Sequence, residues 1–440
     1  MRTFLIIWFG QLVSTFGSRM TSFALQIWAW ELTGQATALS LVGFFSGLPS
    51  IFVTPFAGVI VDRCNRKGLM ILGDAIAALS TLTILCLFLT HHLQIWHLYL
   101  LGAIEGVFVE LQTLAYSTSI TLLVPKQQYA RASSLDAAIH YGAIILAPAL
   151  AGALYGAIQL AGIAMLDLVA FVIALATLLP VRIPQPTLSE QDQQTATTIG
   201  HQLMFGWRYI WVRPGLLALV GLMAMFWFLH DLGGALYAPM ILARSDNNAS
   251  ILGYIASAAG LGGVIGALLL SAWGCPKRLI WGVLLGMVGA GLSKVAFGFG
   301  QAASVWLPAQ LCSSLNFPLL TSSEKTIWLT KVDPAVQGRV LATRSLLMQI
   351  VSAIAMLMAG PLADRVFTPA MSRGGSLTSS LGGILDTGQG AGLALLYIIT
   401  SLGLILVGLL GYACSPVRNV ECSLPDHSAT STGELDESVY

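Results

Sequence analysis

The chain has 440 residues, of which 56% are hydrophobic and 9% are charged, and its formal net charge at pH 7 is +1. Soluble domains carry roughly 25% charged residues, so this composition excludes a large soluble domain and indicates a protein that crosses the membrane many times. A nearly neutral chain without basic tracts gives no sign of nucleic-acid binding. The scattered cysteines lack metal-ligand spacing, so we expect neither a metal nor another cofactor.

The apolar runs predict an all-α membrane protein. A membrane-spanning helix needs about 20 mostly apolar residues, and these runs lack the alternation of barrel strands. Twelve transmembrane helices are expected, near residues 3–30, 36–61, 68–90, 95–123, 131–155, 158–180, 214–241, 251–273, 279–299, 303–329, 338–361 and 390–413.

Polar segments divide these helices into two groups. The polar connection 181–213 is expected to be a cytoplasmic linker between an amino-terminal half, 1–180, and a carboxy-terminal half, 214–414. The acidic tail, 415–440, is expected to be disordered in the cytoplasm. A long outer loop rich in glycine and serine is expected at 362–389.

Lysine and arginine favour one orientation of the chain. They gather at the span ends that share a side with the amino terminus, whereas the opposite loops hold only Arg244, Arg365 and Arg373. Because positively charged loops remain in the cytoplasm, both termini are predicted to be cytoplasmic. The protein is expected in the plasma membrane, which is the inner membrane of a bacterium.

The two halves repeat one another. The stretch "RTFLIIWFG" at Arg2 is matched by "RPGLLALVG" at Arg213, and the basic turn Arg66–Lys67 recurs as Lys277–Arg278. The stretch "LAPALAG", which contains Pro148, recurs at nearly the same offset as "MAGPLAD". Six helices per half make the repeats parallel, and parallel repeats are typical of carriers whose halves rock around a central cavity.

The turn "GVIVDRCNRKG" concentrates charge between two apolar spans. Arg63, Arg66 and Lys67 follow from the orientation alone, but Gly58 and Asp62 do not. Gly58 lies four residues before Asp62, on the same face of a helix, where a glycine permits close approach of a neighbouring helix. Asp62 is placed to contact the positive end of that neighbour.

This turn resembles the loop signature of the major facilitator superfamily, G-x-x-x-D-R-x-x-R-K, and fits it at all five positions. "APALAG", with Pro148 and Gly152, resembles a softened form of the fifth-helix motif of antiporters. The closing stretches "AGPLADRVFTPAM" and "DTGQGAG" resemble the macrolide-efflux and enterobactin-exporter branch. The resemblance implies a gate between Asp62 and the start of the eleventh helix, near Arg339, and export of a medium-sized natural product.

One feature departs from that resemblance. Proton-linked drug antiporters of the family often carry an arginine on the fourth helix, where this chain has Gly102. Glu105 lies between that position and Gly106. The arginine-based account of proton coupling therefore does not transfer to this chain.

Ionisable residues inside the spans form a second group of candidates. Each costs roughly 2.5–3.5 kcal/mol to insert, so by default they mark function. They fall at similar depths, and they are Arg19, Glu105, Glu110, Asp167, Asp231 and Lys294. In the fold that the resemblance implies, the first, fourth, seventh and tenth helices line the substrate cavity, with candidate residues Gln11, Arg19, Glu105, Glu110, Gln112, Asp231, Gln310 and Asn316.

Within this group we expect different roles. Glu105 and Asp231 are the candidates for proton coupling, whereas Glu110 should point about 140° away from Glu105. Asp167 and Lys294 are expected on helices outside the cavity. A structural ion-pair network, such as Arg19 with Glu105, remains the alternative to a functional site.

These observations predict a secondary active transporter that exports a small or medium-sized natural product or drug, by proton antiport and alternating access. An importer or a uniporter is the alternative within transport. A polytopic membrane enzyme would need a catalytic site that the sequence does not display, and a structural anchor would leave the buried charges unexplained. The expected partners are the substrate, protons and the bilayer, and the protein is expected to be a monomer.

Overall fold

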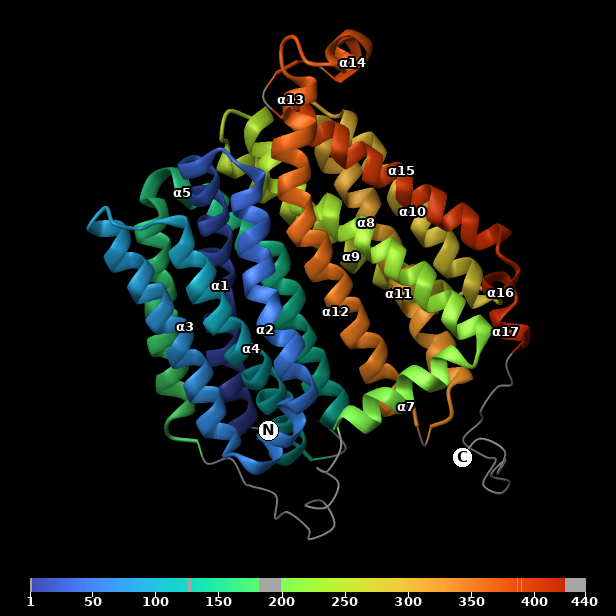
Figure 1. The fold of residues 1–440 in the computed structure, drawn as a ribbon. Coiled ribbons are helices and arrows are strands. Elements are labelled where there is room, and N and C mark those ends of the chain that lie inside the picture. The colour runs from blue at the N-terminus through green and yellow to red at the C-terminus, as the bar shows by residue number, and fades with distance from the viewer. Residues whose placement is uncertain are drawn as a thin grey trace.

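The computed structural model describes residues 2–125, 128–181, 199–334, 336–385, 387–388 and 390–423, and these residues form helices and connections without a strand (Figure 1). The long helices are α1 (Arg2–Thr33), α2 (Ala36–Arg63), α3 (Arg66–Leu89), α4 (Ile95–Leu123), α5 (Tyr129–Leu178), α8 (Pro214–Arg244), α9 (Ala249–Trp273), α10 (Leu279–Phe299), α11 (Ala303–Lys331), α12 (Gln337–Leu362) and α15 (Ala391–Ala413). The shorter elements are α7 (Ile199–Trp211), the π-helical η3 (Ala363–Phe367), α13 (Thr368–Met371), α14 (Thr378–Leu385), α16 (Ser415–Arg418) and α17 (Val420–Ser423).

Helix α5 consists of two antiparallel arms that meet at Gln159, whose backbone (φ 53°, ψ −171°) is not helical. Along the first arm, the Trp8 indole donates to the Leu135 carbonyl at 2.8 Å and the Tyr155 hydroxyl donates to Glu31 at 2.7 Å, so this arm runs parallel to α1. The second arm runs the other way, because the early part of α1 packs against residues near 174 and its middle against residues near 167.

The all-helical, multi-pass class is confirmed. Within the described ranges, nine helices are long and apolar enough to cross a membrane, and α5 is counted once among them. Helices α1 and α11 do not meet the same standard. With α5 read as two arms, every predicted span coincides with a helical segment. The number of twelve crossings stays a prediction.

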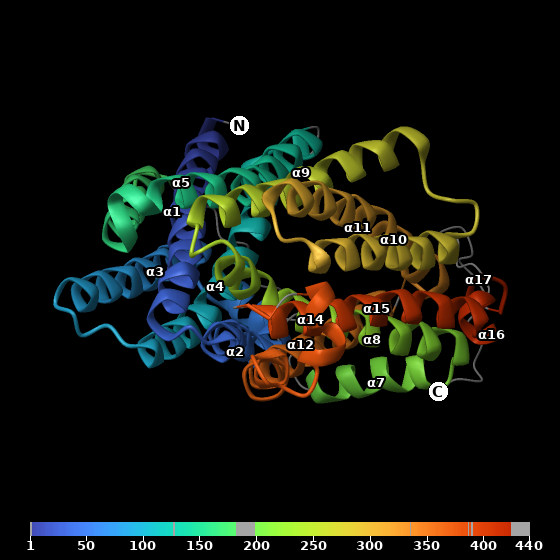
Figure 2. The same cartoon turned by 90° about the horizontal axis from the view of Figure 1, so that it is seen from above.

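The helices form two groups, α1–α5 and α8–α15, that pack against each other mainly through two pairs of helices. Helix α5 contacts α9, and α2 contacts α12, as Figure 2 shows from above. We call the side on which α1 begins the N side, and the side on which α1 ends the far side. The contacts between the groups bring Gly152 of α5 to Ala249, the first residue of α9, and Gly360 of α12 to Thr37 at the start of α2. They therefore lie on the far side.

The hydrophobic core shows the same asymmetry. On the far side, one continuous cluster joins both groups and contains Trp30, Ala151, Leu252 and Ala359. Toward the N side, the core separates into a cluster of the carboxy-terminal group and two clusters of the amino-terminal group. The molecule is therefore packed shut on the far side and divided on the N side.

Three predicted connections differ from the structure. Residues 415–423, predicted as disordered, form α16 and α17 because Val417 and Val420 are buried against the carboxy-terminal group. The first part of the predicted outer loop, 363–371, continues the helical path of α12. The linker contains α7, while its residues 182–198, like residues 424–440 of the tail, lie outside the described residues.

Helix α17 anchors this terminal segment to α10. The Glu421 carboxylate accepts hydrogen bonds from the backbone amides of Leu279 and Ile280, both at 3.0 Å. Arg278, at the N-cap position of α10, provides no side-chain cap. Glu421 therefore satisfies amides that α10 leaves unpaired, and its negative charge faces the positive end of the helix.

We expect Glu421→Ala to lower the thermal unfolding midpoint of the detergent-solubilised protein by a few degrees, because losing a helix cap costs about 0.5–2 kcal/mol. The exposed neighbouring substitution Cys422→Ser should leave the midpoint unchanged. Equal midpoints for both variants would show that α17 does not stabilise α10.

Candidate functional site

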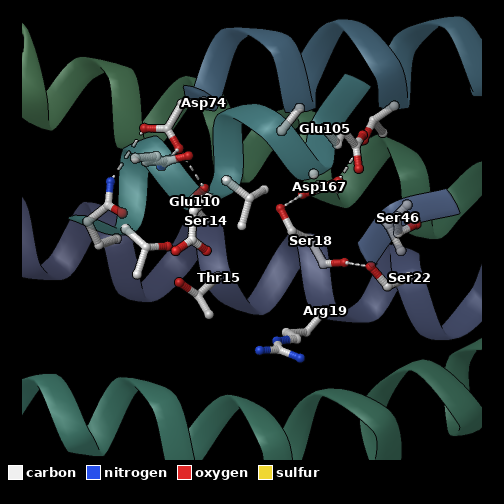
Figure 3. A pocket seen from close by; sticks show the side chains of 18 of the residues that line it. Ser14, Thr15, Ser18, Arg19, Ser22, Ser46, Asp74, Glu105, Glu110 and Asp167 are labelled. Carbon is white, nitrogen blue, oxygen red and sulfur yellow. Dashed lines mark hydrogen bonds between the residues drawn. The ribbon is translucent and has the colours of Figure 1, made fainter. Parts of the chain in front are cut away.

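A polar cavity of about 740 Å³ lies among α1–α5. This volume falls in the range of sites that hold drug-sized ligands. Its lining reaches Tyr116, Ser117 and Asp136, which lie toward the N-side ends of α4 and α5. Figure 3 shows part of this lining. The acidic and basic side chains around it are Arg19, Asp74, Glu105, Glu110, Asp136, His140 and Asp167.

Asp74 joins three helices at one end of this cavity. Its carboxylate accepts hydrogen bonds from the Gln112 amide at 2.6 Å, the Gln11 amide at 3.4 Å and the Ser14 hydroxyl at 3.5 Å. Asp74 is only 4% exposed. Gly73 gives Gln112 the space to reach it, since a Cβ at Gly73 would lie 2.6 Å from the Gln112 Oε1 atom. The site thus surrounds a buried carboxylate with neutral donors.

Asp167 occupies a similar position on the second arm of α5. It accepts hydrogen bonds from the Thr81 hydroxyl at 2.9 Å and the Ser18 hydroxyl at 3.3 Å. It lines the cavity, although the sequence placed it on a helix outside. The reason is the close contact of α5 with α1, where a Cβ at Gly17 would lie 2.6 Å from an Asp167 oxygen.

Glu105 lines the same cavity as Asp167. The Ser80 side chain forms a hydrogen bond with Glu105, and the nearby Asp167 carboxylate interacts unfavourably with it. Glu110 also lines the cavity, and the Thr54 hydroxyl lies 3.5 Å from it. Glu110 thus points to another side of α4 than Gln112 and still borders the cavity. The cavity extends around α4, so that Gln112 faces α3 on one side and Glu110 faces α2 on the other.

Arg19 does not form the predicted alternative, an ion pair with Glu105 that would hold the helices together. Its side chain is exposed in the cavity and points away from Glu105 (Figure 3). Within the described part of the chain, the ion pairs join other residues. The cavity thus holds five carboxyl groups against one arginine.

A second polar cluster lies in the carboxy-terminal group. The His230 Nδ1 atom is 3.1 Å from the Asp231 carboxylate, and Lys294 is 7% exposed and interacts electrostatically with Asp231. The Lys294 amine lies 5.8 Å from the centre of the Tyr397 ring, and the His230 ring packs edge-on against Phe317 at 4.9 Å. Asp231 therefore has His230 in contact and the buried Lys294 as an electrostatic neighbour.

The remaining candidates of this group lie on α11. The Asn316 amide donates to the Cys312 carbonyl at 2.8 Å, and its oxygen lies against Gly289. The Gln310 Oε1 atom is buried without a hydrogen-bond partner among the described residues. Asp231, Gln310 and Asn316 are absent from the lining of the amino-terminal cavity, so their role as substrate ligands stays a prediction.

The basic residues of the turn between α2 and α3 hold it to its own half. Arg66 is buried and donates to the Thr118 carbonyl of α4 at 3.2 Å. Lys67 donates to the carbonyls of Leu179 and Val181, at 2.7 and 2.8 Å, just after α5 ends. The side chains of Asp62 and Arg63 lie outside the part that the structure describes. Arg66 and Lys67 thus fix the position from which α2 presents Asp62.

Pro148 and Gly152 lie where α5 crosses α9. A Cβ at Gly152 would lie 2.5 Å from the Ala249 carbonyl oxygen, and one at Gly253 would lie 2.5 Å from the Pro148 carbonyl oxygen. The Ser250 hydroxyl donates to the Gly152 carbonyl at 3.2 Å. The two backbones are therefore in direct contact, and this crossing helps to close the far side.

The sequence did not single out four residues of these clusters. Asp74, Asp136 and His140 line the cavity, and His230 contacts Asp231. Asp74 and Asp136 lie nearer the N-side ends of their helices than the mid-membrane depth shared by the predicted ionisable residues. Asp74 could have been predicted as a cavity residue because it is an acid inside an otherwise apolar span. His230 could have been predicted because it directly precedes Asp231.

Two helical groups that meet on one side, with a polar cavity among the helices, define a membrane carrier. The family model of the Major Facilitator Superfamily matches residues 7–356. The chain therefore belongs to the Major Facilitator Superfamily. It is a transporter of small molecules and not an enzyme.

Curated relatives share most of its length. Macrolide efflux protein A of Streptococcus pyogenes is 27% identical over 370 residues, which cover 82% of this chain and 90% of the relative. Multidrug efflux pump Tap of Mycolicibacterium fortuitum is 22% identical over 369 residues, which cover 82% of this chain and 89% of the relative.

Solved structures show the same fold. A bacterial homologue of the human lysosomal transporter Spinster, crystallised in an inward-facing and unoccupied conformation, aligns with a TM-score of 0.70 at 15% identity. The alignment covers 96% of this chain and 98% of that protein. This likeness concerns the fold alone.

We expect Asp74→Ala to lower the thermal unfolding midpoint in detergent, because it leaves buried amide donors unpaired at about 1–3 kcal/mol each. Arg19→Gln should leave the midpoint unchanged, since Arg19 is exposed in the cavity. A loss of stability in Arg19→Gln as large as that in Asp74→Ala would restore the structural ion-pair interpretation.

Proposed function

We propose that the chain is a secondary active transporter that exports a small or medium-sized natural product or drug by proton antiport and alternating access. The observation that carries this proposal is the acid-rich cavity, which has five carboxyl groups against one arginine and whose lining extends toward the N side. The efflux names of relatives that match most of the chain support the direction. The protein acts as a monomer in the plasma membrane, which is the bacterial inner membrane, with both termini in the cytoplasm.

The charges of the cavity support proton coupling. Glu105 and Asp167 repel each other, and low polarity strengthens such repulsion. A proton or a cationic substrate relieves it. One group of acids therefore accepts either of two positive species, which is the exchange that antiport requires. Each proton that moves inward through roughly 100 mV supplies about 2.3 kcal/mol.

Asp231 is the second candidate for coupling. It lies between His230 and the buried Lys294, so a proton that enters or leaves this group changes the charge balance of the carboxy-terminal half. In the proposed cycle, substrate binding changes the protonation of Glu105 in the amino-terminal half and of Asp231 in the carboxy-terminal half. The proposal places the substrate between them when the halves rearrange.

The gate on the N side completes the cycle. Asp62 ends α2 on this side, and the resemblance placed its partner at the start of α12, near Arg339. The cores of the two halves are separate here, which matches a state in which this gate is open. Closing the N side would bring Asp62 to the amino-terminal end of α12, where a negative charge is favoured.

We expect Glu105→Gln or Asp231→Asn to uncouple export from the pH gradient while substrate still binds, because each change removes a group that exchanges protons. The measurement is substrate flux in vesicles with and without an imposed pH gradient. Asp246→Asn is the matched control, since Asp246 is exposed in a loop and has a backbone (φ 50°) that asparagine accepts. If both neutral variants respond to the gradient as the parent does, the proton is carried elsewhere, and Glu110 becomes the candidate.

We expect Asp62→Asn to abolish transport while its abundance in the membrane stays near that of the parent, because the N side no longer closes stably. Transport is measured as flux in vesicles and abundance by immunoblotting of the membrane fraction. Normal flux in this variant would leave the turn with its topological role only.

A further inference from the structure

The far-side ends of α2 and α12 are joined by a carboxylate that caps the neighbouring helix. Asp364, in η3 directly after α12, accepts hydrogen bonds from the Ala36 amide at 3.1 Å, the Thr37 amide at 2.8 Å and the Thr37 hydroxyl at 2.6 Å. Ala36 and Thr37 are the first residues of α2, and the side chain of Gln35 at its N-cap provides no cap. The cap of α2 therefore comes from the other half of the molecule.

A glycine makes this contact possible. Gly360 lies so close to α2 that a Cβ on it would collide with the Cα atom of Thr37. One turn before it, Met356 packs against Gly43. The backbone contact at Gly360 and the cap at Asp364 form one unit, which we call the far-side latch (Gly360, Asp364, Ala36 and Thr37).

The far-side latch repeats the sequence pattern of the N-side gate. Gly58-Val-Ile-Val-Asp62-Arg63 ends α2 on the N side, and Gly360-Pro-Leu-Ala-Asp364-Arg365 lies where α12 passes into η3 on the far side. The helices are antiparallel neighbours, since Thr37 lies beside Gly360 and Gly43 beside Met356. Each therefore brings a G-x-x-x-D-R end to the side on which the other begins.

We propose that these two G-x-x-x-D-R ends act as opposed latches of one switch, and that Asp364 holds the far side closed in the state seen here. The far-side latch is made when α2 and α12 touch at their far ends. Opening the far side breaks three hydrogen bonds and returns the first amides of α2 to an uncapped state. The proposal rests on the alternating access of the proposed function.

Two further observations distinguish a latch from an ordinary cap. A helix is normally capped by residues of its own chain segment, whereas this cap crosses from one half to the other and lies on the side where both halves share one core. Asp364 also lies in a π-helical turn, and such turns are rare and frequently occur at functional sites.

The test measures accessibility of the far side in the full-length protein. A variant with its six cysteines replaced by serine receives Met356→Cys as a reporter, because Met356 is half-buried and packs against Gly43 of α2 when the far side is closed. A membrane-impermeant maleimide is applied to the far side of oriented membrane vesicles. We expect Asp364→Ala to raise the labelling rate roughly twofold to thirtyfold, which is the range that loss of a helix cap predicts.

Further variants separate a latch from a loss of folding. Thr37→Ala removes one of the hydrogen bonds and should raise the rate roughly twofold to tenfold. Gly360→Ala collides with α2 only while the far side is closed, so it should also raise the rate. Arg365→Ala is the matched control, since Arg365 is the exposed neighbour of Asp364, and its rate should equal that of the parent.

The opposed roles of the two aspartates give the sharpest outcome. Asp62→Asn should lower the labelling rate, and the double variant Asp62→Asn/Asp364→Ala should return it toward the parent value. The proposal would be overturned if the labelling rates of Asp364→Ala, Thr37→Ala and Gly360→Ala equalled that of Arg365→Ala. It would also be overturned if Asp62→Asn and Asp364→Ala shifted the labelling rate in the same direction. The assay needs no substrate or proton gradient, so failure of proton antiport would leave its result standing.

Discussion

A carboxylate inside a bilayer has no bulk water to solvate it, and this constraint organises the amino-terminal half. The structure surrounds buried acids with neutral donors, as amides and a hydroxyl do for Asp74 and hydroxyls do for Asp167. Glu105 has a hydrogen bond with Ser80 and an unfavourable interaction with the nearby Asp167 carboxylate. This second interaction is what distinguishes Glu105 and makes it our candidate for exchange of a proton or a cationic substrate.

The same constraint explains why the two halves meet through glycine and backbone. Polar side chains on a surface that opens and closes would be left unpaired in one of the two states. At Gly152 and Gly253 the contacting atoms are carbonyl oxygens and Cα atoms, whose hydrogen bonds remain within their helices. The backbone groups of such a surface keep their partners when it separates. Side-chain hydrogen bonds that cross it include those from the Ser250 and Ser257 hydroxyls of α9 to the Gly152 and Ile145 carbonyls of α5, and these hydroxyls would lose their partners on opening.

The sequence predicted the helices well because insertion in a bilayer depends on long apolar runs, which are local properties. It predicted the acids at mid-depth for the same reason. It did not predict which acids share a cavity, because that depends on how α4 is surrounded and on Gly17 bringing Asp167 to α1. Asp364 was placed in a loop because the apolar run ends near Pro361, although the helical path continues through η3. The packing of Val417 and Val420 was not predicted, because two valines do not change the polar composition from which disorder was inferred.

The cavity and the helix crossings place different demands on the chain during evolution. The walls of the cavity carry side chains such as Ser50 and Thr113, which lie on the surface that meets the substrate. The crossing of α5 and α9 has little freedom to change, because any residue larger than glycine at position 152 meets a main-chain oxygen at 2.5 Å. Substrate range is thus free to diverge among descendants while the moving parts stay fixed, and one mechanism is able to serve many compounds.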